Sequence, residues 1–136
     1  DEMKIKRIIM GEDEPTNCWG ELFYTTNIDI IGLGLTTVES DIWWLLTHRA
    51  SIYYTNYCNM RKYMKNQITY YDVIDDLETS NLKDGQRQRQ TYLKKENIHH
   101  LLTGAHVVVK SIQLSQCNGR YEDAYYRIIQ MIKEEI

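Results

Sequence analysis

The chain contains one phenylalanine and one proline among its 136 residues. A domain of this size usually fills its core with phenylalanine and leucine, but here eleven tyrosines carry most of the aromatic content. A tyrosine ring gives a large apolar contact area, and its hydroxyl requires water or a hydrogen-bond partner. Tyrosine is therefore frequent in protein interfaces and on surfaces that stack nucleic-acid bases. The composition indicates a binding function and leaves the ligand open.

Cysteine and long apolar runs are also scarce. Cys18, Cys58 and Cys117 are far apart and form no Cys-x-x-Cys pair, so the sequence suggests neither a disulfide framework nor a zinc site. We therefore expect a reducing compartment, either the cytoplasm or the interior of a host cell. No run approaches the roughly 18 apolar residues of a membrane span, so we expect a soluble protein without a membrane partner.

The chain has little net charge, −3 with an isoelectric point near 5.8, which argues against a general polyanion binder. Its length predicts a single domain over residues 1–136. The many Ile, Asn, Tyr and Lys residues, with a single proline, are typical of AT-rich coding sequences. This association favours a viral, phage or low-GC bacterial origin.

Residues 1–35 read as a β-rich N-terminal part. Apolar residues alternate over residues 3–10, a polar stretch follows at 11–17, and a mixed apolar segment covers 18–26, which together predict a hairpin. Residues 28–35 form a third apolar run, in which Gly32 and Gly34 suggest a bend or a close backbone approach.

Residues 36–136 read as a helical part of about four helices in a bundle-like arrangement, which makes the fold class α-dominated α+β. The pair Thr36 and Glu39 has the spacing of a capping box, and an apolar stripe at intervals of three and four then continues to Met64. The other predicted elements are a short helix over 69–77, a connection over 79–85, a long helix over 98–112 with a strand at 107–109 as the alternative, and a last helix from Tyr121 after the stop signal Asn118-Gly119.

The leading functional hypothesis is a non-enzymatic protein-binding factor that acts on host machinery or in assembly. Aromatic residues are abundant on and beside the first long helix, while no catalytic constellation has a suitable spacing. Wide apolar sectors in a small chain also predict a homo-oligomer. The predicted partner-binding residues are Trp43, Trp44, Tyr53, Tyr54, Tyr57 and Tyr63.

A second hypothesis is a nucleic-acid-binding accessory protein. The segment 83–95 has a local excess of positive charge interleaved with glutamines, and basic residues around position 62 would extend it if the two segments met. A solvent-exposed helix entry is the alternative explanation. The residues assigned to this function are Arg61, Lys62, Lys65, Arg87, Arg89, Tyr92, Lys94 and Lys95.

A third hypothesis is a metal-dependent or acid–base enzyme. Glu96 and His99 have the Glu-x-x-His spacing of carboxylate-bridged metal sites, and His100 and His106 lie nearby in sequence. His99 and His106 would stand two helical turns apart, about 10 Å, which is too far for one metal ion. The alternative is that these residues form the polar outer face of the helix. We expect that the protein binds no cofactor and is not an enzyme.

The sequence Gly32-x-Gly34-x-x-Thr37 partly resembles a dinucleotide-binding turn. It lacks the third glycine, and the pattern of the following residues predicts no second buried strand ending in an acidic residue. We therefore interpret the two glycines as a bend before the first long helix.

Overall fold

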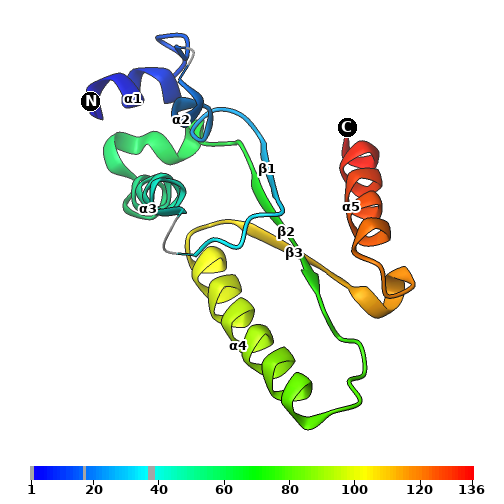
Figure 1. The fold of residues 1–136 in the computed structure, drawn as a ribbon. Coiled ribbons are helices and arrows are strands. Elements are labelled where there is room, and N and C mark those ends of the chain that lie inside the picture. Colours follow the sequence, from blue (N-terminus) through cyan, green and yellow to red (C-terminus); the bar gives the residue numbers. More distant parts are fainter. Residues whose placement is uncertain (1, 17, 37–38) are drawn as a thin grey trace.

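The computed structural model describes residues 2–16, 18–36 and 39–136 (Figure 1). Helices of all kinds cover 59% of the chain and strands 13%, so the predicted helix-dominated α+β class is confirmed. The helical elements are α1 (Glu2–Ile9), α2 (Trp19–Leu22), α3 (Ser40–Thr55), the 3-10 segment η2 (Tyr57–Tyr63), α4 (Leu82–Gly104), the 3-10 segment η3 (Leu114–Cys117) and α5 (Tyr121–Glu135). The strands are β1 (Ile28–Ile31), β2 (Ile68–Ile74) and β3 (Val108–Gln113).

The three strands form one parallel sheet in the order β1, β2, β3. Parallel strands need a long crossover connection, and α3 and α4 occupy the two crossovers, so the chain contains two successive βαβ units. In Figure 1 these two helices lie on one side of the sheet and α5 lies on the other. None of the helices in the described ranges is both long enough and apolar enough to cross a membrane.

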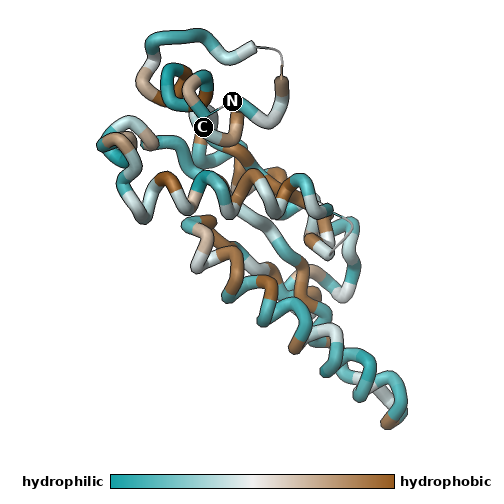
Figure 2. Tube along the Cα trace, turned by 90° about the vertical axis from the view of Figure 1, so that its left-hand side faces the viewer, coloured by the Kyte–Doolittle hydropathy of each residue, from teal (hydrophilic) through white to brown (hydrophobic). Residues whose placement is uncertain are grey.

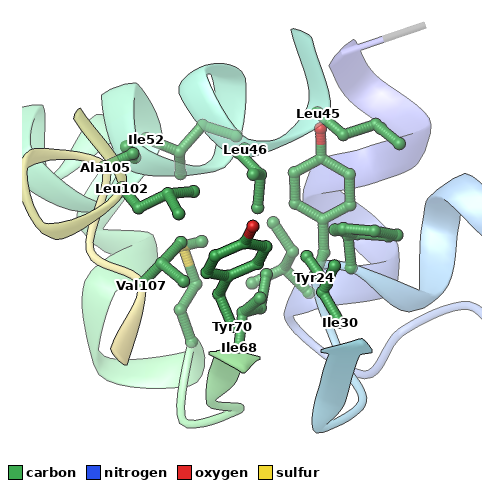
Figure 3. Packing of buried hydrophobic residues seen from close by; sticks show 14 of the residues in the cluster. Tyr24, Ile30, Leu45, Leu46, Ile52, Ile68, Tyr70, Leu102, Ala105 and Val107 are labelled. Carbon is green, nitrogen blue, oxygen red and sulfur yellow. The ribbon is translucent and has the colours of Figure 1, made fainter. Parts of the chain in front are cut away.

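The larger hydrophobic core lies between the sheet and α3, with the C-terminal end of α4 at its margin (Figure 3). Leu46 of α3 and Ile68 of β2 are completely buried there. The ring of Tyr70 is also buried, and its hydroxyl donates to the carbonyl of Leu33 at 2.7 Å. Tyrosine thus serves as a core residue in this chain because its hydroxyl finds a backbone acceptor.

A second, smaller core lies between the sheet and α5. Tyr71 and Val73 of β2 point into it, opposite to Tyr70, because successive strand residues face opposite sides. Ile128 of α5 is completely buried against them. Strand β2 therefore contributes to both cores, and both of its faces are covered.

The predicted N-terminal hairpin is wrong, because residues 2–9 form helix α1 and residues 19–22 form α2. The isoleucines of the first segment also have helical spacing, and this spacing buries Ile8 and Ile9 while Ile5 packs beside them. A short apolar run fits both periods, so its pattern alone does not separate strand from helix. Lys4 of α1 pairs with Glu21 of α2 at 2.6 Å and joins the two helices.

The first long helix is shorter than predicted, because α3 ends at Thr55. Asn56 after α3 and Cys58 and Asn59 inside η2 all adopt left-handed backbone angles, with φ between 49° and 58°. Asparagine tolerates this conformation better than most residues do. The apolar stripe nevertheless continues across the break, since Met60 of η2 is buried in the same core.

The short helix predicted over 69–77 is wrong, because this region contains strand β2. The long helix predicted over 98–112 is partly wrong: α4 ends at Gly104, and the alternative of a strand is confirmed by β3. The predicted connection over 79–85 is shorter, since α4 already begins at Leu82, where the Asn81 side chain accepts a hydrogen bond from the Asp84 amide at 2.8 Å. The helices therefore flank a sheet and do not form a bundle.

The last helix is confirmed, whereas the stop predicted at Asn118 and Gly119 follows the short 3-10 segment η3 and not a long helix. Asn118 and Gly119 have positive φ angles of 56° and 67°, and α5 begins two residues later. The bend predicted around Gly32 is also confirmed, since this residue ends β1 with a φ of 73°. Thr37, the last residue of the glycine motif, lies outside the described residues.

Candidate functional site

Trp44 of α3 is an exposed aromatic side chain that is held in a fixed position. Its residue surface is 58% exposed, and its ring lies parallel to the imidazole of His48 with 5.0 Å between the ring centroids. Nδ1 of His48 is hydrogen-bonded to the hydroxyl of Tyr24 at 2.6 Å. Burial raises the pKa of Tyr24 to about 12, so this hydroxyl keeps its proton at neutral pH. A buried residue therefore orders an exposed one.

A hollow of about 150 Å³ lies beside His48. Tyr57 of η2 forms part of its wall and is itself 48% exposed. Met60 and Ile52 supply an apolar floor, because both side chains are buried. Tyr57 lines the hollow directly, whereas Trp44 is connected to it through His48, a lining residue on whose ring Trp44 stacks. We call the rings of Trp44 and Tyr57, together with the hollow, the aromatic surface. The lining residues are Glu2, His48, Ser51, Ile52, Thr55, Tyr57 and Met60.

The other predicted partner-binding residues are divided between the core and separate surfaces. Trp43 is partly buried, and its Nε1 donates to the carbonyl of Leu35 at 2.9 Å. Tyr53 packs against the core with its ring stacked on His106 at 4.0 Å. Tyr54 and Tyr63 are 54% and 39% exposed, but neither contributes to the wall of the hollow.

A larger groove lies between α4 and the sheet, at the carboxyl ends of β2 and β3. It consists of cavities of about 620 and 450 Å³ that share the side chains of Ile74 and Tyr92. Open α/β sheets generally bind ligands beyond the carboxyl ends of their parallel strands. Figure 2 shows that the hydrophilic end of α4 near Leu82 projects away from the rest of the molecule. We call this region the α4 groove.

Polar contacts between α4 and β2 lie at this groove. Asp72 is buried, and its two carboxylate oxygens bind Lys95 Nζ at 3.1 Å and His99 Nε2 at 2.7 Å. Lys95 also donates to the carbonyl of Val73. Farther along the helix, the Gln88 amide donates to the carbonyl of Leu77 at 2.7 Å. The sequence analysis did not identify Asp72, because it placed residues 69–77 in a short helix. The β-branched and aromatic residues around Asp72 were the available signal of a strand.

The structure brings together three of the four residues of the predicted metal site. Glu96, His99 and His100 all line the 620 Å³ cavity, whereas His106 lies beyond the end of α4 and stacks on Tyr53. Burial, together with the positive charge of a nearby arginine, lowers the pKa of His106. Across residues 2–16, 18–36 and 39–136, no three His, Cys, Asp or Glu side chains are placed to hold a metal ion.

The structure separates the residues predicted to bind nucleic acid into two groups. Arg87 and Lys95 line the 450 Å³ cavity, near the start and middle of α4. Arg61 instead donates to the carbonyls of Tyr53 and Tyr54, near His106 and the far end of α4. Because α4 has 23 residues, its ends lie about 34 Å apart at roughly 1.5 Å per residue. Within the basic set, Lys62 and Lys65 follow Arg61 in η2 and the next loop, and Arg89 and Lys94 are exposed on α4.

The glycine segment after β1 is tied to the core. Tyr70 binds the carbonyl of Leu33 and Trp43 binds the carbonyl of Leu35, so side chains of β2 and α3 hold this loop. The structure corrects one sequence argument, because α3 is followed by a buried strand with Asp75 and Asp76 directly after it. The absence of the third glycine remains the sequence argument against a dinucleotide-binding turn.

No family model, curated protein or solved structure matches this chain.

Proposed function

We propose that this chain is a protein-binding module that docks its partner on the aromatic surface around Trp44 and Tyr57. The observation that carries the proposal is the exposed Trp44 ring, which is stacked on His48 and supported from the core by Tyr24. Buried tryptophan and tyrosine anchors dominate the energetics of protein interfaces.

The order of the Trp44 ring supports this assignment. Immobilising a mobile side chain at an interface costs about 0.5–1.5 kcal/mol. The stacking on His48, with an interplanar angle of 5°, means that much of this ordering precedes binding. The adjacent hollow of about 150 Å³ has room for a small apolar side chain of the partner. A second copy of the chain is one candidate partner, and a mass that stays monomeric across micromolar dilutions would exclude it.

Quantitative capture with matched variants tests the proposal. The immobilised chain is compared with Trp44→Ala, Tyr57→Ala and the control Tyr126→Ala, whose tyrosine on α5 is 65% exposed and far from the hollow in sequence. The captured protein is then purified and its affinity for each variant is measured. We expect Trp44→Ala to weaken this affinity by about 30-fold, equivalent to roughly 2 kcal/mol. Tyr126→Ala should retain binding. Equal binding by wild type and Trp44→Ala would refute the assignment of the surface.

Nucleic-acid binding by α4 is the second candidate function. Lys83, Arg87, Arg89 and Lys94 make no salt bridge within the described ranges, and Tyr92 is 48% exposed beside them. Unpaired cations beside an exposed ring are suited to phosphate contacts and base stacking.

Fluorescence anisotropy with labelled single- and double-stranded DNA and RNA tests this candidate at about 50 and 200 mM salt. Because the two basic groups are separate, Arg87→Gln with Arg89→Gln should weaken binding and reduce its salt dependence, whereas Lys62→Gln with Lys65→Gln should not. No binding at the lower salt concentration would remove this candidate.

A further inference from the structure

Within the part of the chain that the structure describes, β1 is an edge strand with no strand beside its outer backbone. The Ile28 amide donates to the carbonyl of Gln67 next to β2, so the amides of Ile28 and Ile30 point toward β2. Because strand amides alternate in direction, those of Asp29 and Ile31 point away from the sheet. Three of the four residues of β1 are isoleucine, a composition typical of an interior strand in a parallel sheet.

The face of β1 on the α5 side is also open. The core on this side is formed by residues of β2, β3, η3 and α5, while Asp29 and Ile31 stay exposed. Along α5, exposed or partly exposed apolar residues recur at intervals of three and four and form a continuous stripe. The stripe consists of Tyr125, Ile129, Ile132 and Ile136.

A cavity of about 440 Å³ lies between the end of this stripe and β1. Asp29 and Glu135 both line it. Lys110 pairs with Glu135. Partial desolvation of the exposed Asp29 and the negative charge of Glu135 raise the pKa of Asp29, while the positive charge of Lys110 lowers it. Because Lys110 also pairs with Glu135, the two carboxylates share one cation. A cation supplied from outside would complement this carboxylate.

The charge of this surface decides between two occupants. A second copy placed by a two-fold axis would bring two acidic cavities together, and β1 itself carries no cation. An extended segment with a basic residue would satisfy the free backbone groups and the carboxylate together.

We propose that the free edge of β1 binds an extended segment of a partner protein as a fourth strand, with a Lys or Arg side chain directed to Asp29 and apolar side chains covering Ile31 and Ile129. This surface lies on the opposite side of the sheet from the helix that carries Trp44. Substitutions at one surface therefore do not touch the other, so an experiment can refute the β1 proposal without refuting partner binding at the aromatic surface, and the reverse.

Selection from a display library of random twelve-residue peptides on the wild-type chain tests this proposal. We expect enriched peptides to contain Lys or Arg flanked by β-branched apolar residues. Their affinity should fall about tenfold or more with Asp29→Lys, and a Lys→Glu change in the peptide should restore binding to that variant. Ile31→Pro removes an outward amide and should also abolish binding.

Asp41→Lys and Trp44→Ala are the controls, since Asp41 is an exposed acid of α3. Both should bind the selected peptides like the wild type. If Ile31→Pro fails to fold, the charge exchange at Asp29 still decides the question. The proposal is overturned if no peptide is enriched, or if the enriched peptides bind Asp29→Lys as tightly as the wild type.

Discussion

Asp72 is a buried carboxylate whose two partners, Lys95 and His99, both come from α4. Replacing it by asparagine would leave Lys95 Nζ without its negative partner in a partly buried position. We expect Asp72→Asn to lower the free energy of unfolding by about 2 kcal/mol. Urea unfolding at neutral pH measures this, with the exposed Asp41→Asn as a control that should change stability by less than about 0.5 kcal/mol. Equal stability of the two variants would mean that the contact contributes nothing.

The lowered pKa of His106 leads to a prediction about how stability depends on pH. Its pKa is lowered chiefly by burial of the ring and also by the charge of Arg49, so the folded state binds a proton more weakly than the unfolded chain does. The stability linked to this residue is complete above about pH 6.5 and is lost as the pH falls through the lowered pKa. His106→Asn, which tolerates the left-handed φ of 60°, should therefore lose less stability than the wild type between pH 7 and 5. Urea midpoints at several pH values measure the difference, and parallel curves would contradict the prediction.

The turn at Asn56 after α3 is followed by two further left-handed residues inside η2, Cys58 and Asn59, next to Tyr57 of the hollow. Asn59 has a left-handed φ of 58° and no side-chain hydrogen bond within the described ranges. We expect Asn59→Ala to lower the free energy of unfolding by about 1 kcal/mol, because a Cβ without a polar group disfavours this backbone angle. Asn59→Gly should be neutral or slightly stabilising. Thermal unfolding of the two variants tests the idea, and an alanine variant as stable as the glycine variant would refute it.

The last helix was easier to predict from the sequence than strand β2, which is buried on both faces. The last helix begins where the sequence predicts it, two residues after Gly119. Strand β2 shows no alternation, because both of its faces are buried, and its apolar residues happen to have helical spacing. For the same reason the sequence did not reveal Asp72 as the partner of His99. Glu96, His99 and His100 could be grouped from sequence because they lie on one helix.

At the scale of the whole molecule, the two cores share β2. Leu46 belongs to the core under α3 and Ile128 to the core under α5, and both side chains are completely buried. The sequence could not predict this division, since it depends on the order of three strands that are far apart in the chain. If β2 couples the two cores, the molecule should unfold in one cooperative transition.

Leu46→Ala and Ile128→Ala test this coupling. Each should lower the free energy of unfolding by about 2–5 kcal/mol through the cavity that it leaves. The two losses should add within about 0.5 kcal/mol, because the side chains lie on opposite faces of the sheet. The three tryptophans, Trp19, Trp43 and Trp44, all belong to α2 or α3, and Trp43 packs against the core on that side. Tryptophan fluorescence should therefore detect the change at Ile128 only if the two cores are coupled. Coincident fluorescence and circular-dichroism transitions in urea are the expected result. An Ile128→Ala variant that leaves the fluorescence transition unmoved would instead show that the two faces of the sheet unfold independently.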